Sequence, residues 1–337
     1  MSPRPRVPSR PISVFVRAML TLILLAAGPA SGLAAETGRP IRIALNDLPG
    51  KGMLPIMVAI EHMRERGLDI EVSYLNSENI VLQALAADLA DIGMGTPYKP
   101  IQDGNLPVRM FFQLSRLAFF PVVNTEFYQD WADLDGIEMY AHGPGSGTEA
   151  LLNVLAERHG IRYSKMNYLP GSGTRAHAML SGRIKATVLD AERKRMVLAQ
   201  APERFKVLPM GDVRATDEAL FASETYIATH HAKLEALIAT LLDVWARINA
   251  DPAWLAAERE RLGLLADMDA GEIDRITPYI EELVTSEVFA ADGGVNDVPA
   301  DFAFYTASGT LKDDAASLKE EMFWDLGPLR QVLKARH

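Results

Sequence analysis

The stretch Ala141-His-Gly-Pro-Gly-Ser-Gly-Thr148 is a glycine-rich turn between an apolar run and an amphipathic one. Residues 137–140 before it predict a strand, and residues 149–159 after it predict a helix. The first backbone N–H groups of a helix lack partners inside the helix, and the helix dipole adds partial positive charge there. The turn is therefore suited either to capping its own helix or to holding an oxygen atom of a ligand.

The core of this turn occurs twice in the chain. Pro144–Thr148 reads Pro-Gly-Ser-Gly-Thr, and Pro170–Thr174 reads the same. Two neighbouring strand–turn–helix units therefore present the same kind of edge. We expect the second copy to be architectural, with Thr174 acting only as a helix cap, because it lies one strand further out.

Apolar strand-like runs and helical runs alternate on both sides of the turn. The expected strands are residues 41–45, 70–75, 91–96, 108–114, 118–123, 137–140, 166–169, 185–189, 205–208 and 219–227. The expected helices between them favour an α/β fold with parallel sheets. Residues 231–249 form a clear helical pattern, and the remaining tail is mostly helical. We expect two β/α lobes joined by a two-segment hinge, with residues 36–118 plus 219–337 as lobe I and 119–218 as lobe II.

The first 35 residues have the layout of a secretory signal peptide. Four arginines form a basic region before residue 18, residues 18–27 are apolar, and residues 32–35 supply small side chains for cleavage. The apolar run is shorter than the roughly 20 residues that span a membrane. We therefore expect residues 1–35 to be removed and the mature protein to be periplasmic.

Charge and cysteine content exclude several classes of function. The chain carries a net charge of −10, and removing residues 1–35 leaves 30 basic and 44 acidic residues, a net charge of −14. Nucleic acid is not an expected partner, because phosphate binding needs a basic surface. The 337 residues include no cysteine, which excludes disulfides, thiolate metal sites and cysteine nucleophiles.

The glycine-rich turn does not fit the common catalytic motifs. It lacks the lysine of a phosphate-binding P-loop, and its serine misses the spacing of a nucleophile elbow. A loose dinucleotide fingerprint is not followed by an acidic residue at the end of the next strand. The seven histidines, His142 and His177 among them, form no metal-binding spacing. We expect no catalytic residue, no cofactor and no metal site.

Ligand binding fits the strand ends better. In open α/β sheets, ligands lie beyond the carboxyl ends of the strands, where turns and helix starts meet. Two such edges that face each other across a hinge form a cleft that can close on a small molecule. The candidate ligand-binding residues are Asn46, Gly50, Glu78, Thr96, Ser115, Gly145, Ser146, Gly147, Thr148, Asp190 and Glu192.

Taken in order, these features resemble periplasmic solute-binding proteins of the nitrate/sulfonate/taurine type, which share a fold with thiamine-pyrimidine-binding relatives. The matching segments are the export leader, Ala90–Thr96, the Gly-Pro-Gly-Ser-Gly-Thr turn, residues 178–190, and the tail segments 304–312 and 323–326. The resemblance implies a type II periplasmic binding protein-like fold. It also implies a monomer that captures a small molecule and presents it to the membrane permease of an ABC transporter.

The ligand and the partner are open at this point. The acids Glu78, Asp190 and Glu192 argue against a simple inorganic anion. If two of them face the cleft, a neutral or amine-bearing ligand is favoured, since an unpaired buried carboxylate is costly. The binding protein of a tripartite transporter and a sensory module that docks on a receptor are alternatives. A third is an enzyme on the same fold, although its pyrimidine-forming relatives depend on a cysteine-rich signature that this chain lacks.

Overall fold

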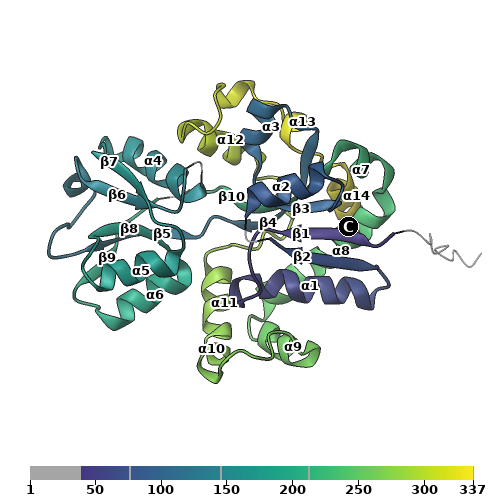
Figure 1. Ribbon diagram of the computed structural model, residues 1–337, viewed down its shortest axis with the longest axis horizontal. Coiled ribbons are helices and arrows are strands. Elements are labelled where there is room, and N and C mark those ends of the chain that lie inside the picture. The colour runs from purple at the N-terminus through teal and green to yellow at the C-terminus, as the bar shows by residue number, and fades with distance from the viewer. Residues whose placement is uncertain (1–38, 76, 145, 212, 337) are drawn as a thin grey trace, which may run out of the picture. The chain divides into compact units, whose positions relative to one another are not determined.

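The structure is a computed structural model that describes residues 39–336 apart from 76, 145 and 212, all within the unit that begins at Arg39. The predicted signal peptide lies outside the described residues, and so does the candidate Gly145. Strands and helices alternate as far as residue 223, and helices follow (Figure 1). The predicted α/β class is confirmed.

The first sheet contains the strands that begin the described chain. In chain order the elements here are β1 (Ile41–Leu45), the 3-10 helix η1 (Lys51–Met53), α1 (Leu54–Glu65), β2 (Ile70–Tyr74), α2 (Glu78–Ala86), β3 (Ile92–Gly95), α3 (Tyr98–Gly104) and β4 (Val108–Arg116). A later strand, β10 (Thr216–Ser223), completes the sheet in the order β2-β1-β3-β10-β4.

The direction of β10 corrects the expectation of a parallel sheet. β1 is parallel to β2 and β3, but β10 is antiparallel to both β3 and β4. The chain leaves this sheet after β4 and returns beside its own exit, where the Leu117 N–H donates to the carbonyl of Ala215 (2.8 Å). The returning strand consequently enters at the edge where β1 and β3 end, so its first residues lie at that edge.

The middle of the chain forms two smaller sheets. Its elements are β5 (Phe119–Asn124), the 3-10 helix η2 (Ala132–Leu134), β6 (Glu138–Ala141), α4 (Gly147–His159), β7 (Lys165–Tyr168), α5 (Ser172–Leu180), β8 (Ala186–Asp190), α6 (Ala191–Gln200) and β9 (Phe205–Val207). One sheet has the order β8-β5-β9 with antiparallel pairing, and the other pairs β6 with β7 in parallel. The Thr187 hydroxyl donates to the carbonyl of Tyr140 (2.8 Å) and links them.

The tail is helical, as expected. It comprises α7 (Glu224–Thr229), α8 (His231–Ala250), α9 (Trp254–Leu262), α10 (Ala270–Asp274), α11 (Ile276–Thr285), α12 (Val298–Ala307), η3 (Ala315–Ser317), α13 (Glu320–Phe323) and α14 (Gly327–Arg336). The strand expected over 219–227 ends at Ser223, because the Ser223 hydroxyl accepts from the Tyr226 N–H (3.1 Å) and caps α7. In α8, the buried apolar positions are Leu234, Leu237, Ile238, Leu241, Leu242, Trp245 and Ile248.

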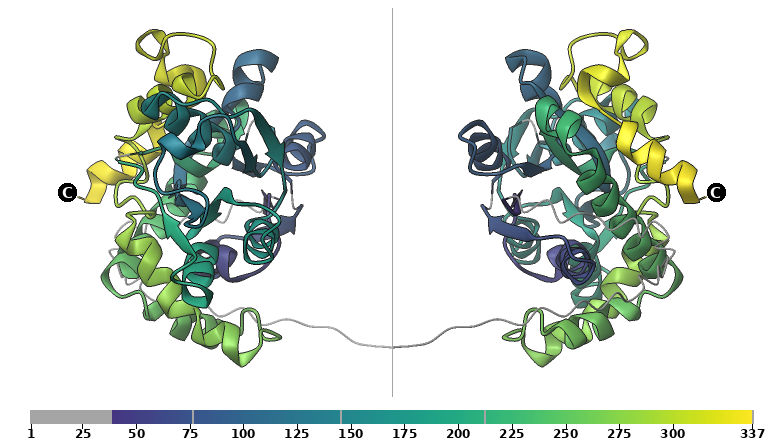
Figure 2. Two further views of the ribbon diagram at one scale, coloured as in Figure 1. Left: turned by 90° about the vertical axis from the view of Figure 1, so that its left-hand side faces the viewer. Right: turned by 90° about the vertical axis from the view of Figure 1, so that its right-hand side faces the viewer.

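The tail packs on both parts of the chain. α8 packs on α1, and α14 packs on α8 and β4, whereas α11 contacts α6 and α12 contacts α4. Figure 2 shows the helices of the last part of the chain gathered along one side of the unit. Since the tail touches elements of both predicted lobes, the domain limits given above stay a prediction.

A buried polar network fixes the start of β10. The Asp301 carboxylate accepts from the Thr216 N–H (2.6 Å), the Thr216 hydroxyl (2.7 Å) and the Tyr98 hydroxyl (2.7 Å). Burial raises the pKa of Asp301 to about 6, and these hydrogen bonds oppose that rise. The Tyr305 hydroxyl donates to the Thr216 carbonyl (2.7 Å). Thr216 is thus held from both its backbone groups, which positions the two acidic residues that follow it.

Candidate ligand-binding site

Acidic side chains from three separate segments meet where β1 and β3 end and β10 begins. The Asn46 side-chain amide, just after β1, donates to both carboxylate oxygens of Glu218 (3.0 Å each). The charges of Glu78, Asp217 and Asp47 all act on Glu218 as well. We call Glu78, Asp217 and Glu218 the strand-end acids.

Glu78 lies over the end of β3, where a glycine leaves room for its side chain. Gly95 has φ of +153°, and a Cβ atom there would lie 2.6 Å from the Cγ atom of Glu78. Any larger residue would displace the Glu78 side chain. Burial raises the pKa of Glu78, and a backbone hydrogen bond with Thr96 opposes this rise. Glu78 begins α2, so the predicted helix over 80–89 starts two residues earlier.

Asp217 and Glu218 are acids that the sequence reasoning missed. Both were placed at the end of lobe II, predicted as residues 119–218, because the next strand was expected to begin at residue 219. Burial, followed by the charge of Asp190, raises the pKa of Asp217 to about 7. Burial, followed by the charges of Asp217 and Glu78, raises the pKa of Glu218, which the Asn46 amide opposes. An acidic pair directly before a buried apolar run was the signal that could have found them.

The start of α4 lies beside Asp217. An ideal Cβ on Gly147 would be 3.8 Å from Asp217 Oδ1 and 3.1 Å from a methyl group of Leu117. The candidate Gly147 is therefore close to the strand-end acids, although it belongs to the second part of the chain.

The hydroxyl groups of the glycine-rich turn are bonded inside the turn itself. The Ser146 hydroxyl accepts from the Glu149 N–H (3.4 Å) and caps α4, and it lies 2.9 Å from the Thr148 hydroxyl. The Thr148 oxygen accepts from the His142 N–H (2.9 Å), and Thr148 is only 3% exposed. Ligand contact by Ser146 and Thr148 stays a prediction, but both groups already serve the fold.

The second Pro-Gly-Ser-Gly-Thr turn has a different structure. Its α5 is capped by Gly171 at φ of +82° without a side-chain bond, so the expected role of Thr174 as the cap is wrong. The Ser172 hydroxyl instead accepts from the Asp190 N–H (3.0 Å). The His142 ring accepts from the Gly171 N–H (3.2 Å) and joins the two turns.

The two predicted acids of the second part differ in their partners. The Asp190 carboxylate caps α6 by accepting from the Arg193 N–H (2.7 Å). The Glu192 carboxylate bonds the Lys51 ammonium (2.6 Å), which also bonds Glu272 (2.9 Å). Lys51 is buried, and Arg193 also pairs with Glu192 (2.7 Å). Glu192 thus links the two parts of the chain and has its charge matched by the protein.

The other candidates of the first part lie around the same edge. Ser115 is half-buried opposite Glu218 in the β4–β10 pairing, and Thr96 directly follows β3. Gly50 has extended backbone, and its carbonyl accepts from the Met53 N–H (3.0 Å) before α1. Gly50 therefore shapes the loop after β1 without a demonstrated contact to the strand-end acids.

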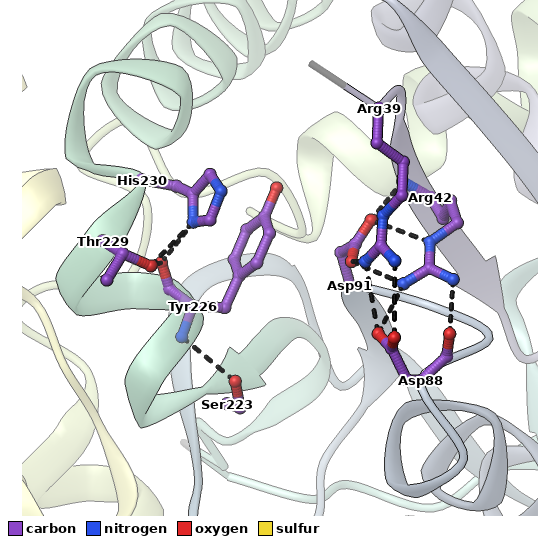
Figure 3. Close-up of polar contacts among 8 residues, drawn as sticks. All are labelled: Arg39, Arg42, Asp88, Asp91, Ser223, Tyr226, Thr229 and His230. Atoms are coloured by element: carbon purple, nitrogen blue, oxygen red, sulfur yellow. Dashed lines mark hydrogen bonds and ion pairs between the residues drawn. The ribbon is translucent and has the colours of Figure 1, made fainter.

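A second acidic group lies at the opposite end of β3 (Figure 3). Arg39 and Arg42 both bond Asp91 (2.6 and 2.8 Å) and Asp88 (3.2 and 2.8 Å). Burial would raise the pKa of Asp91, but hydrogen bonds from Arg42 and Arg39 outweigh it and lower the pKa. We call these four residues the amino-end cluster. Beside it, the rings of Tyr226 and His230 stack with centroids 4.1 Å apart.

One cavity of about 440 Å³ lies between α2 and the strands β1 and β2. Arg42, Glu71, Ser73 and Gln83 contribute its polar groups, and none of the candidate residues lines it. In the described part of the chain, no three metal-binding side chains cluster together, and no helix has the length and apolar character of a membrane span.

The comparisons with known proteins agree with this fold. No curated protein sequence matches the chain significantly. A protein of Bordetella bronchiseptica RB50 is similar in structure, with TM-score 0.67, 18% identity, and coverage of 88% of this chain and 98% of the other. The periplasmic aliphatic sulphonate-binding protein SsuA of Escherichia coli is similar with TM-score 0.62 and 17% identity, and the match covers 86% of this chain and 93% of that protein. The periplasmic nitrate-binding protein NrtA of Synechocystis PCC 6803 is similar with TM-score 0.63 and 12% identity, and the match covers 88% of each chain.

The family is shown by the sequence. Residues 52–254 match the family described as NMT1/THI5 like, which covers more than half of the chain. The structural neighbours share the periplasmic binding protein-like fold that the sequence resemblance predicted, and that prediction is confirmed. The chain belongs to the NMT1/THI5-like family.

Proposed function

We propose that this protein is an extracytoplasmic solute-binding protein that captures a small organic molecule between its two lobes and delivers it to an ABC permease. The observation that carries the proposal is the meeting of strand ends from one part with helix starts from the other. Asp217 lies beside the start of α4, and Lys51 bonds the first turn of α6. This is the edge of an open α/β sheet at which ligands bind.

The way the chain crosses between the parts supports a mechanism of opening and closing. The two crossing segments lie side by side at Leu117 and Ala215. A hinge of this kind lets two lobes rotate while their internal packing is kept. The ion pair between Lys51 and Glu192 is then a contact that forms when the lobes close and breaks when they open.

The proposed ligand contacts come from both sides of this edge. Asn46, Glu78, Thr96 and Ser115 would contact the ligand from the first sheet. Backbone N–H groups at the start of α4, together with Asp190, would contact it from the other side. The solved neighbours that bind sulphonates and nitrate support the binding role, and a structurally similar ligand-binding component of an ABC-type import system from Staphylococcus aureus supports an ABC permease as the partner.

The location and assembly state follow from the same proposal. A periplasmic binding protein exchanges between free and docked forms, so we propose a monomer that docks transiently. Amino-terminal sequencing of the exported protein tests cleavage near residue 35. Sedimentation of the purified protein tests the monomer, and a stable dimer would contradict it.

Ligand screening of the purified mature chain tests the binding role. We expect at least one member of a panel of sulfonates, aromatic acids, pyrimidines and amines to raise the melting temperature by several degrees, because a ligand that binds only the folded state stabilises it. The same compound should reduce the radius of gyration in solution scattering. If no compound does either, the proposed function is wrong.

A further inference from the structure

The strand-end acids lack a basic partner. Among the ion pairs of the described residues, none includes Glu78, Asp217 or Glu218. Burial is the largest cause of the raised pKa in all three; the charge of Asp190 adds to it at Asp217, and the charges of Asp217 and Glu78 add to it at Glu218. In the described part of the chain, the donors to them are neutral: the Asn46 side-chain amide bonds the oxygens of Glu218, and the Thr96 backbone bonds Glu78, so neither cancels a charge.

Asp217 is the most conspicuous member, because no hydrogen bond or ion pair of its carboxylate is recorded in the described structure. The side chains that interact electrostatically with it are not basic. The charge of Asp190, at the end of β8, acts on Asp217, and the charge of Asp217 acts on Tyr279 of α11 and on Tyr305 of α12. The start of α4 is close to this carboxylate, since a Cβ atom built on Gly147 would lie 3.8 Å from Asp217 Oδ1. An unpartnered carboxylate in such surroundings requires a proton or an external cation.

Basic residues are present nearby, but each is committed elsewhere. The Lys51 ammonium is shared between Glu192 and Glu272, and Arg193 pairs with Glu192. The buried Arg175 donates to the carbonyls of Val188 (3.0 Å) and Leu169 (3.0 Å). Among the described residues, these cations are therefore bonded to other groups, and none of them is a partner of a strand-end acid.

We infer that the ligand of this site is a small organic cation, one that carries a protonated amine or a guanidinium group, and that Asp217 and Glu218 bind this group. The inference rests on the proposed function and specifies the class of its ligand. A cationic N–H group would donate to Asp217 and Glu218 together, and charge-assisted bonds of this kind are stronger than neutral ones. A sulfonate or nitrate would meet three carboxyl groups without a basic partner, and any of them that is ionised opposes its binding.

The charge of the ligand also predicts a proton exchange. Burial raises the pKa of Asp217 to about 7, so Asp217 is largely protonated at pH 6 in the empty site, and the pKa of Glu218 is raised in the same direction. A cation binds the ionised form, so binding releases protons near pH 6. Amines stay protonated through this range, and affinity therefore rises several-fold between pH 6 and pH 8.

Matched pairs of probes test the inference. Benzylamine, putrescine and agmatine are compared with phenylmethanesulfonate and propane-1-sulfonate by thermal shift and calorimetry on the purified mature chain. We expect the amines or agmatine to bind, and Asp217→Asn and Glu218→Gln to weaken that binding at least ten-fold. Glu126→Gln changes an exposed acid in the turn that follows β5, and it should leave the affinity for the cation unchanged. Calorimetry in buffers of different ionisation enthalpy measures the released protons.

The outcomes separate this inference from the proposed function. Binding of a sulfonate or of an uncharged pyrimidine, with no binding of the cations, would overturn the cationic class and leave the solute-binding role intact. Binding of a cation that both variants retain would also overturn it, because the charge would then be recognised elsewhere. If neither these probes nor the wider panel binds, both proposals fail together. Native mass spectrometry of the purified protein gives a second readout, and a co-purified anion would contradict the inference.

Discussion

Two groups of acidic side chains flank the same strand, β3, in opposite surroundings. At its amino end, Asp88 and Asp91 are bonded by two arginines, and their pKa values are lowered. At its carboxyl end, the strand-end acids have no basic partner among the residues that the structure describes, and their pKa values are raised. The first group supports the fold, because its charges are matched within the chain. The second group is held in place by the fold against its own electrostatic preference, which is the arrangement expected of a binding site.

Removing the central acid of the amino-end cluster should have the largest effect on stability. The Asp91 side chain is 5% exposed and accepts from Arg39, from the Arg42 side chain and from the Arg42 backbone N–H (2.9 Å). Asp91→Asn leaves two arginines short of a partner, and we expect a loss of about 3 kcal/mol in the free energy of unfolding. Urea titration at pH 7 measures this.

Acidification provides the control for that prediction. A carboxyl whose pKa is lowered by folding stabilises the protein above its unfolded pKa, and this stabilisation is lost as pH falls through the folded pKa. The gap between wild type and Asp91→Asn should therefore narrow below about pH 4. Asp88→Asn, at a side chain 78% exposed, should be nearly neutral, because solvent screens its ion pairs. Equal losses for the two variants would show that burial does not set the effect.

Removing Lys51 should give the second-largest loss of stability, because the two glutamates that it pairs with would lose their basic partner. The Lys51 side chain is 5% exposed and bonds Glu192 and Glu272. The hydrogen bond from Lys51 lowers the pKa of Glu272. We expect Lys51→Met to cost about 2 kcal/mol at pH 7 and less as pH falls below about 4, because the stabilisation that comes with the lowered pKa of Glu272 is lost as pH falls through that pKa. Lys99→Met, at an exposed pair with Asp103, is the matched control and should be nearly neutral. A similar loss for both lysines would contradict the prediction.

Neutralising a strand-end acid should have the opposite sign. Asp217 has a raised pKa in the folded state, so folding favours its protonated form, and wild-type stability falls as pH rises from about 4 through about 7. Asp217→Asn removes this penalty, and we expect the ligand-free variant to be more stable than wild type by about 1–2 kcal/mol at pH 8 and about equal at pH 4. Melting temperatures across that range measure the difference. The exposed Asp69→Asn should show no such trend, and a destabilised Asp217→Asn at pH 8 would reverse our interpretation of the whole cluster.

The sequence was sufficient for the fold but only partly for the site. Period and turn residues predicted nearly every strand, because burial patterns act locally along the chain. The antiparallel entry of β10 was not predicted, since it depends on where the chain returns to the first sheet. Asp217 and Glu218 were missed for that reason: in sequence they precede a strand, and only the reversed direction brings them to the edge where β1 and β3 end.

The sequence also could not predict which side chain each acid bonds. Glu78, Asp190 and Glu192 were equivalent as acids that follow strands. Their partners separate them: Glu192 bonds a lysine 141 residues away, Asp190 caps its own helix, and Glu78 lies over Gly95. Side-chain pairing across long sequence separations has no periodic signature. The charge of the ligand could be suggested from composition, but the specific acids could not be chosen.

The turn with which the sequence reasoning began gives the smallest predicted effect and tests whether the comparison holds beyond carboxylates. The Ser146 hydroxyl is bonded to groups of its own turn, just as the acids of the amino-end cluster are bonded to groups of the protein. By the same reasoning it should act on stability: Ser146→Ala removes a helix cap and should cost about 1 kcal/mol in unfolding free energy. Ligand affinity should change less than two-fold, whereas Asp217→Asn should lower affinity while raising stability. Measuring both quantities in both variants is decisive, because a direct contact of Ser146 with the ligand would cost about 1 kcal/mol of binding as well. A ten-fold loss of affinity in Ser146→Ala with unchanged stability would show that a partnered group can still be a ligand contact here, and the division between fold-supporting and ligand-binding groups would have to be abandoned.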